Sequence, residues 1–154
     1  MNYNDLKKKW LWKSVDFDWV YWSQCVDFAR QWALDLHWVK IGWFSGSALN
    51  GWKTGSPFNK QWIRVTNTLN AIPPAWAVVF FDVLYKNWRI INPYGHVAIT
   101  WDWCTQKKLV ILEQNAWNGN WDGKLGNAIK ESILDYVNPS RCLWWFVFNP
   151  NIKK

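Results

Sequence analysis

Cys25 and His96 are residues whose types suit nucleophilic attack on a carbonyl carbon. The thiolate of a cysteine is a strong nucleophile, and the imidazole of a histidine takes and gives protons near neutral pH. Cys25 falls in the first turn of an expected helix, where the helix dipole and unpaired backbone N–H groups favour the thiolate. Considered singly, each residue is better explained as structural, Cys25 as a buried thiol on an apolar stripe and His96 as a hydrogen-bonded histidine.

Glu113 and Asn115 lie two residues apart, directly after an apolar stretch. Side chains at this spacing share one face of a β-strand. A carboxylate and an amide in such a strand need polar partners, because burying them unpaired is costly. An imidazole nitrogen is one suitable partner, and the carboxylate would then fix its tautomer and stabilise the imidazolium. The alternative is two exposed polar residues at the end of a strand.

The elements that must position these residues are a helix and several strands. Apolar residues recur with helical spacing over 24–37, with Ser23 before them as the expected N-cap, and 58–70 has a weaker helical pattern. From residue 77 the pattern is that of strands. The β-rich runs are Val78 to Leu84, His96 to Trp101, Leu109 to Asn115 and Leu143 to Phe148. This order predicts an α+β fold with N-terminal helices packed on an antiparallel β-sheet.

Three segments together resemble the motifs of CHAP domains, the cysteine, histidine-dependent amidohydrolase/peptidase modules of phage endolysins and bacterial wall hydrolases. The segments are Ser23-Gln24-Cys25-Val26-Asp27, Tyr94-Gly95-His96-Val97-Ala98-Ile99 and Leu112-Glu113-Gln114-Asn115. The order Cys, His, Glu, Asn is similar to that of the family, as are the 17-residue step from His to Glu and the two-residue step to Asn. The resemblance extends from about Val15 to Phe148 and outweighs the structural explanation of each residue taken singly.

The resemblance implies one catalytic domain over 1–154, with its core at about 15–148 and a papain-like α+β fold. It also implies a peptidoglycan hydrolase, either an N-acetylmuramoyl-L-alanine amidase or a cross-bridge endopeptidase. Cys25 would attack the carbonyl, and His96 would activate Cys25 and then protonate the leaving amine. Glu113 would orient His96, and Asn115 would support the site. The Cys25 backbone N–H would form part of the oxyanion hole, with Gln24 as a further candidate for that region.

Asp16, Asp18 and Asp27 occupy positions 1, 3 and 12 of a twelve-residue stretch, which is the oxygen-ligand spacing of a calcium loop. The stretch resembles the place where some endolysin CHAP domains carry calcium next to the nucleophile. The implied chemistry requires no cofactor, so Ca²⁺ would be structural. Tyr21 stands at position 6, where an EF-hand has glycine. The alternative is three surface aspartates near a helix N-terminus, where negative charge is favourable without a metal.

Seventeen of the 154 residues are tryptophan, far above ordinary usage. Several stand where glycine is expected, because turns often need a positive φ. In Asp18-Trp19-Val20-Tyr21-Trp22 the tryptophans replace glycines of the family pattern. Similar positions are Trp38, Trp43, Trp76, Trp103, Trp117 and Trp121.

Two explanations of the tryptophans are open. Either they form an aromatic surface for sugar rings or fill the core, or the source organism reads the UGA codon as glycine. Under the second explanation Trp52, Trp62 and one of Trp144 and Trp145 are expected to be true tryptophans.

The formal net charge is +7, and the basic residues are scattered. This indicates a solvated surface or attraction to a polyanion such as the cell wall. No nucleic-acid motif accompanies the charge, so no nucleic-acid partner is expected. No apolar run is long enough to span a membrane, and the N-terminus lacks the features of a signal peptide. We expect a monomer made in the cytoplasm that acts on the wall after phage or prophage lysis.

Two other functions remain open from the sequence. One is a non-catalytic, Trp-rich module that binds cell wall or glycan, and a weaker one is a basic nucleic-acid binder. The remaining cysteines, Cys104 and Cys142, fall in or beside expected strands and have no metal-ligand spacing. We expect them to be structural thiols without a disulfide.

Overall fold

The protein is described from a computed structural model, which defines residues 3–20, 23–42, 47–54, 58–68, 71–82, 84–86, 89–92, 94–101, 104–115, 128–135, 142–149 and 151. The helices are α1 (Tyr3–Trp10), α2 (Cys25–His37) and α3 (Ala48–Thr54). The strands are β1 (Trp62–Thr66), β2 (Val78–Phe81), β3 (Leu84–Lys86), β4 (Arg89–Asn92), β5 (His96–Thr100), β6 (Lys108–Glu113), β7 (Lys130–Asp135) and β8 (Cys142–Phe148). Helices followed by strands confirm the predicted α+β class.

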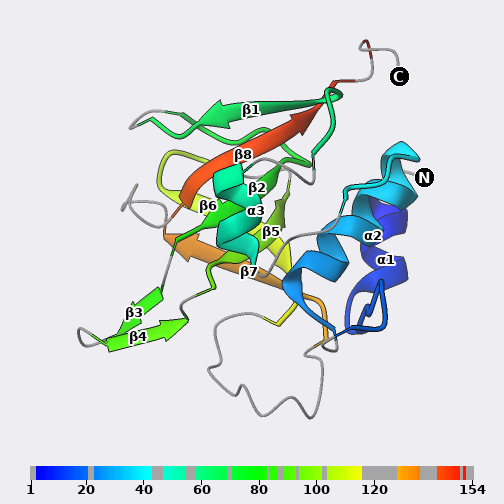
Figure 1. Ribbon diagram of the computed structural model, residues 1–154, viewed down its shortest axis with the longest axis horizontal. Helices are drawn as coiled ribbons and strands as arrows, with labels where there is room; N and C mark the ends of the chain where they lie inside the picture. The colour runs from blue at the N-terminus through cyan, green and yellow to red at the C-terminus, as the bar shows by residue number, and fades with distance from the viewer. Residues whose placement is uncertain are drawn as a thin grey trace.

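Six strands build one antiparallel sheet in the order β1-β8-β2-β5-β6-β7, and β3 pairs with β4 in a separate two-stranded sheet (Figure 1). Strands β5 and β6 are neighbours, with Ile99 paired to Leu112. Because they are antiparallel, the start of β5 and the end of β6 lie at the same end of the sheet. His96 opens β5 and Glu113 closes β6, so the topology brings these two residues together.

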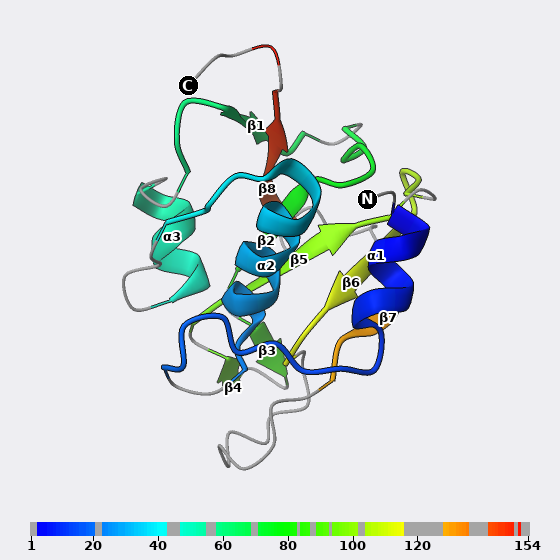
Figure 2. The same ribbon diagram turned by 90° about the vertical axis from the view of Figure 1, so that its right-hand side faces the viewer.

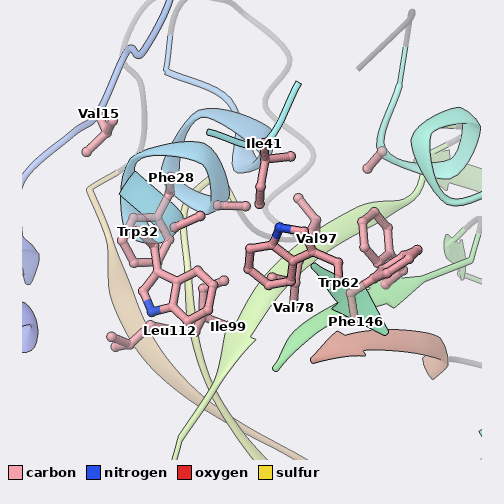
Figure 3. Close-up of a cluster of buried hydrophobic side chains, with 14 of the residues drawn as sticks. Val15, Phe28, Trp32, Ile41, Trp62, Val78, Val97, Ile99, Leu112 and Phe146 are labelled. Carbon is pink, nitrogen blue, oxygen red and sulfur yellow. The ribbon is translucent and has the colours of Figure 1, made fainter. Parts of the chain in front are cut away.

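Helix α2 lies across one face of the sheet, over β2 and β5 (Figure 2). Its apolar residues have i, i+3 and i+4 spacing, so they share one side of the helix and bury it against the strands. Figure 3 shows this core, which includes Phe28, Trp32, Val78, Val97, Ile99 and Leu112. The opposite face is also covered by a buried cluster, which includes Val79, Ala98, Ile111 and Trp145. Burial on both faces explains why β2 is a continuous apolar run and why every residue of β5 is buried.

Two local predictions are wrong. The N-cap of α2 is Gln24 and not Ser23, because the Gln24 N–H bonds to the Asp27 carboxylate at 2.7 Å. The weak helix over 58–70 is instead strand β1, whose branched residues suit a sheet and which pairs with β8 along its whole length. Among the described residues no helix has both the length and the apolar character needed to cross a membrane.

Candidate active site

The N-terminus of α2 brings Cys25 to His96. Cys25 is the first residue of α2 and is half-buried, and His96 is the first residue of β5 and is 2% exposed. Cys25 is near enough to act on the imidazole, since it is among the causes that raise the pKa of His96. A partly accessible sulfur beside a buried imidazole is the arrangement that a nucleophile and its base require.

Gly95 fixes the position at which β5 begins. Its φ is 68°, and a Cβ atom at this position would lie 2.7 Å from the Phe81 carbonyl oxygen and 3.1 Å from the Leu49 Cβ. Only glycine fits both the conformation and the space. The pairing of Phe81 with His96 therefore depends on the residue before the histidine.

Glu113 is the second partner of His96. The His96 Nε2 lies 3.0 Å from the Glu113 Oε2, and both side chains are at most 2% exposed. The register of β5 and β6, continued by one pair, sets Glu113 opposite Ala98, whose neighbour on the same face is His96.

Strand β7 holds the other oxygen of this carboxylate. The Ser132 hydroxyl donates a hydrogen bond to Glu113 Oε1, and the Lys130 Nζ lies 3.9 Å from the same atom. Lys130 pairs directly with Glu113, and Ser132 is the next residue of β7 on that face. No sequence motif contains these two residues, and only the strand register places them beside Glu113.

The imidazole lies between two partners that favour its charged form. Burial lowers the pKa of His96, but the hydrogen bonds and charges of Cys25 and Glu113 outweigh burial and raise it to about 9. Burial raises the pKa of Glu113, and the bonds to His96 and Ser132 reverse this, so its pKa is lowered overall. The geometry therefore favours an imidazolium beside the cysteine at neutral pH.

Gln114 and Asn115 join the end of β6 to the start of α2. The buried Gln114 donates through Nε2 to the carbonyl oxygens of Val15 at 2.6 Å and Gln24 at 3.1 Å, and its Oε1 accepts from the Val15 N–H at 2.8 Å. The Asn115 Nδ2 donates to the Gln24 Oε1 at 3.1 Å. The sequence motif included Gln114 without giving it a role.

The sequence pattern predicts that Asn115 and Glu113 share one strand face, and this prediction is wrong. Strand β6 ends at Glu113, and Asn115 has a φ of 55°. Asparagine tolerates this left-handed conformation better than most residues, which explains its use at this turn. Asn115 thus reaches Gln24 and not the strand face.

Asp16, Asp18 and Asp27 come together beside the start of α2, with one carboxylate oxygen of each within 4.8 Å of the others. Asp27 is 1% exposed, and its Oδ1 is buried without a hydrogen-bond partner. Burial is the main cause that raises the pKa of Asp27 to about 7. Asp18 also forms an ion pair with Arg30.

Neither a protein-family profile nor a curated protein sequence matches the chain. One solved structure that does match is that of a wild type endolysin, LysIME-EF1, with a TM-score of 0.70 and 18% sequence identity. The match covers 96% of this chain and 62% of the endolysin chain, so this chain spans less than two thirds of that protein. The chain therefore has an endolysin-like α+β fold.

Proposed function

We propose that this protein is a peptidoglycan hydrolase that cleaves an amide bond of the bacterial cell wall through Cys25. The observation that carries the proposal is the buried His96, whose Nε2 lies 3.0 Å from Glu113 Oε2 and whose pKa is raised by both Cys25 and Glu113. A nucleophile, a base and an orienting carboxylate in this order form a catalytic triad. The endolysin-like fold supports peptidoglycan as the substrate, because endolysins are wall hydrolases.

The proposed reaction has two stages. The Cys25 thiolate attacks the amide carbon, the His96 imidazolium gives its proton to the leaving amine, and the C–N bond breaks to leave a thioester on Sγ. Neutral His96 then takes a proton from water, which attacks the thioester. Expulsion of the thiolate releases the carboxylic acid and restores the starting pair. Glu113 holds the imidazole in the required orientation throughout.

The start of α2 would stabilise the tetrahedral oxyanion. The first backbone N–H groups of a helix have no partner within the helix, and that of Cys25 is the nearest to the reacting sulfur. The bond from Asn115 fixes the side-chain amide of Gln24 beside this position. Positioning Gln24 is the supporting role that we assign to Asn115.

Asp16, Asp18 and Asp27 would hold a structural calcium ion. The residues fit, because the buried Oδ1 of Asp27 lacks a partner that a cation would provide. Calcium takes about six to eight oxygen ligands, so backbone carbonyl groups or water would complete the site. A bound ion would neutralise the cluster and order the segment that leads into Cys25, and no hydrolytic step passes through it.

The test compares wild type, Cys25→Ala and Cys104→Ala on purified cell wall. Cys104 is a half-buried thiol bonded to the carbonyl oxygens of Trp101 and Val110, so it is the matched control. We expect Cys25→Ala to bind wall without clearing it, and Cys104→Ala to clear it like wild type. Mass spectrometry of the products then identifies the muramoyl–L-alanine amide or a cross-bridge bond. Clearing by Cys25→Ala, or none by wild type on walls of several bacteria, would refute the proposal.

A non-catalytic glycan-binding module is the second candidate. Three tryptophans favour it, since Trp12, Trp19 and Trp38 are 74%, 88% and 80% exposed, and exposed aromatic rings suit sugar binding. This function requires glycan binding that is lost when these three residues are replaced by alanine and unchanged in Cys25→Ala. Wall clearing by wild type would exclude it.

A further inference from the structure

Four tryptophans have a backbone conformation that bulky residues rarely adopt. Among the described residues, five that are not glycine have a positive φ: Trp12 (67°), Trp19 (62°), Trp38 (56°), Trp76 (73°) and Asn115 (55°). Asparagine is enriched in this region, whereas a large side chain there is an outlier because its Cβ crowds the backbone. The four tryptophans have φ values between 56° and 73°, in the same region as Gly95 at 68°.

Two of these residues lie just after helices. Trp38 is the left-handed C-terminal cap of α2, and its N–H bonds to the Leu34 carbonyl oxygen at 3.0 Å. Trp12 follows the end of α1, and its N–H bonds to the Ile129 carbonyl oxygen at 2.8 Å. A left-handed residue directly after a helix is usually glycine. Both indole rings are largely exposed, so tryptophan gains little burial at either position.

The other two residues form turns, one in the segment that carries the acidic cluster and one just before β2. The Trp19 N–H bonds to Asp16 Oδ1 at 2.8 Å within the segment that carries the acidic cluster. The Trp76 N–H bonds to the Thr100 carbonyl oxygen at 2.9 Å just before β2 begins. At both positions the backbone makes the turn, and the turn needs the positive φ that glycine supplies without strain.

A second group of tryptophans is entirely different. Trp32, Trp62 and Trp145 lie within α2, β1 and β8 and are at most 6% exposed. None of them has a positive φ. Trp32 and Trp62 pack in the main core (Figure 3), and Trp145 packs in the cluster on the opposite face. One amino acid therefore occupies two kinds of position, one typical of tryptophan and one typical of glycine.

We propose that Trp12, Trp19, Trp38 and Trp76 are glycine in the native protein. The gene would carry UGA at these codons, read as glycine by the organism that makes the protein, and UGG at Trp32, Trp62 and Trp145. The proposal rests on backbone conformation and burial, so it stands or falls independently of the proposed hydrolase. It also removes three exposed indole rings, and with them the observation that favours glycan binding.

The gene and the native protein test this directly. We expect UGA at codons 12, 19, 38 and 76, UGG at codons 32, 62 and 145, and peptide masses from the native protein that contain glycine at the first four positions. UGG at those four codons, or peptide masses that contain tryptophan there, would overturn the proposal.

Recombinant full-length chains provide a second test that needs no native material. We compare the chain that has tryptophan at positions 12, 19, 38 and 76 with one that carries glycine at these four positions. A matched control carries Trp32→Gly, Trp62→Gly and Trp145→Gly. The first set should raise the thermal midpoint by about 10 °C or restore folding to a chain that otherwise aggregates. The control set should lower the midpoint or prevent folding. An unchanged or lower midpoint for the first set would contradict the conformational argument.

Discussion

At the residue scale, the protonation of His96 sets the pH range in which the proposed hydrolase can work. Its two partners, Cys25 and Glu113, raise its pKa from the usual value of 6.5 to about 9. Because the pKa of His96 is raised, its interactions with Cys25 and Glu113 stabilise the fold fully below pH 6.5. This contribution is lost as the pH rises toward 9. Stability and the supply of a proton to the leaving amine should therefore decline over the same alkaline range.

The alkaline limb of the activity profile tests this role. We expect kcat/KM on a soluble wall fragment to fall as pH passes about 9, because neutral His96 cannot protonate the leaving amine. Glu113→Gln should move this limb to lower pH and reduce kcat/KM by about a hundredfold, since one anionic partner is lost. Glu131→Gln, which changes an exposed β7 residue paired with Lys7, is the control. An identical limb in wild type and Glu113→Gln would refute the role of Glu113.

Ser132 should act by positioning Glu113. Ser132→Ala removes the hydroxyl that holds Glu113 Oε1 and should lower kcat about tenfold while KM stays near its wild type value. Ser132→Thr keeps a hydroxyl and should restore most of the activity. Steady-state kinetics of the two variants distinguish this role from a general loss of folding, which would affect both.

At the element scale, the start of β5 depends on Gly95. Gly95→Ala puts a Cβ 2.7 Å from the Phe81 carbonyl oxygen at a φ of 68°, so it should reduce the free energy of unfolding by at least about 2 kcal/mol. Gly42→Ala is the control, because Gly42 is exposed and has no positive φ. Denaturant unfolding measures both. Equal stability of the two variants would show that the start of β5 adjusts freely.

The segment before α2 should respond to calcium. At a calcium concentration about a hundredfold above its Kd, we expect the thermal midpoint to rise by about 5 to 10 °C, and a chelator should reverse the rise. Asp27→Asn should abolish the response, since Asp27 carries the buried oxygen without a partner. Asp5→Asn, in α1, should keep it. No response in wild type would remove the calcium proposal.

The sequence predicts elements where a periodic pattern and burial coincide. The sequence predicts helix α2 and strands β2, β5, β6 and β8 near their observed bounds, because each carries a clear apolar pattern. Helix α1 has three lysines in its last turn, and α3 has only seven residues, so neither pattern stands out. Strand β1 has a weak helical pattern in sequence, but its pairing with β8, which is remote in sequence, decides its conformation.

The site also divides into features that local sequence motifs predict and features that depend on contacts between remote residues. The order and spacing of Cys25, His96 and Glu113 predict that these residues belong to one site, because each lies in a short local motif. The bonds of Ser132 to Glu113 and of Gln114 to Val15 are not predicted, because they depend on strand register and on residues 99 positions apart. The turn at Asn115 replaced an expected strand face, since alternation alone does not show where a strand stops.

At the scale of the whole molecule, the net charge of +7 should assist attachment to an anionic wall. Raising the salt concentration from 0.1 to 1 M shortens the Debye length from about 10 to about 3 Å, so wall binding should weaken markedly. Cosedimentation with purified wall measures this, with cleavage of a small neutral wall fragment as the control for the site itself. Binding that does not change with salt would exclude charge as its main cause.

The position of β8 has a consequence for how the protein is made. This strand, the last of those described in sequence, lies inside the sheet between β1 and β2. Cys25 leaves the ribosome early, but the sheet that supports its partners cannot close until residue 148 has been synthesised. Contacts between remote parts of a chain form slowly. A nascent or truncated chain would thus carry Cys25 without a finished site, and the proposed hydrolytic activity would begin only after translation of the whole sheet.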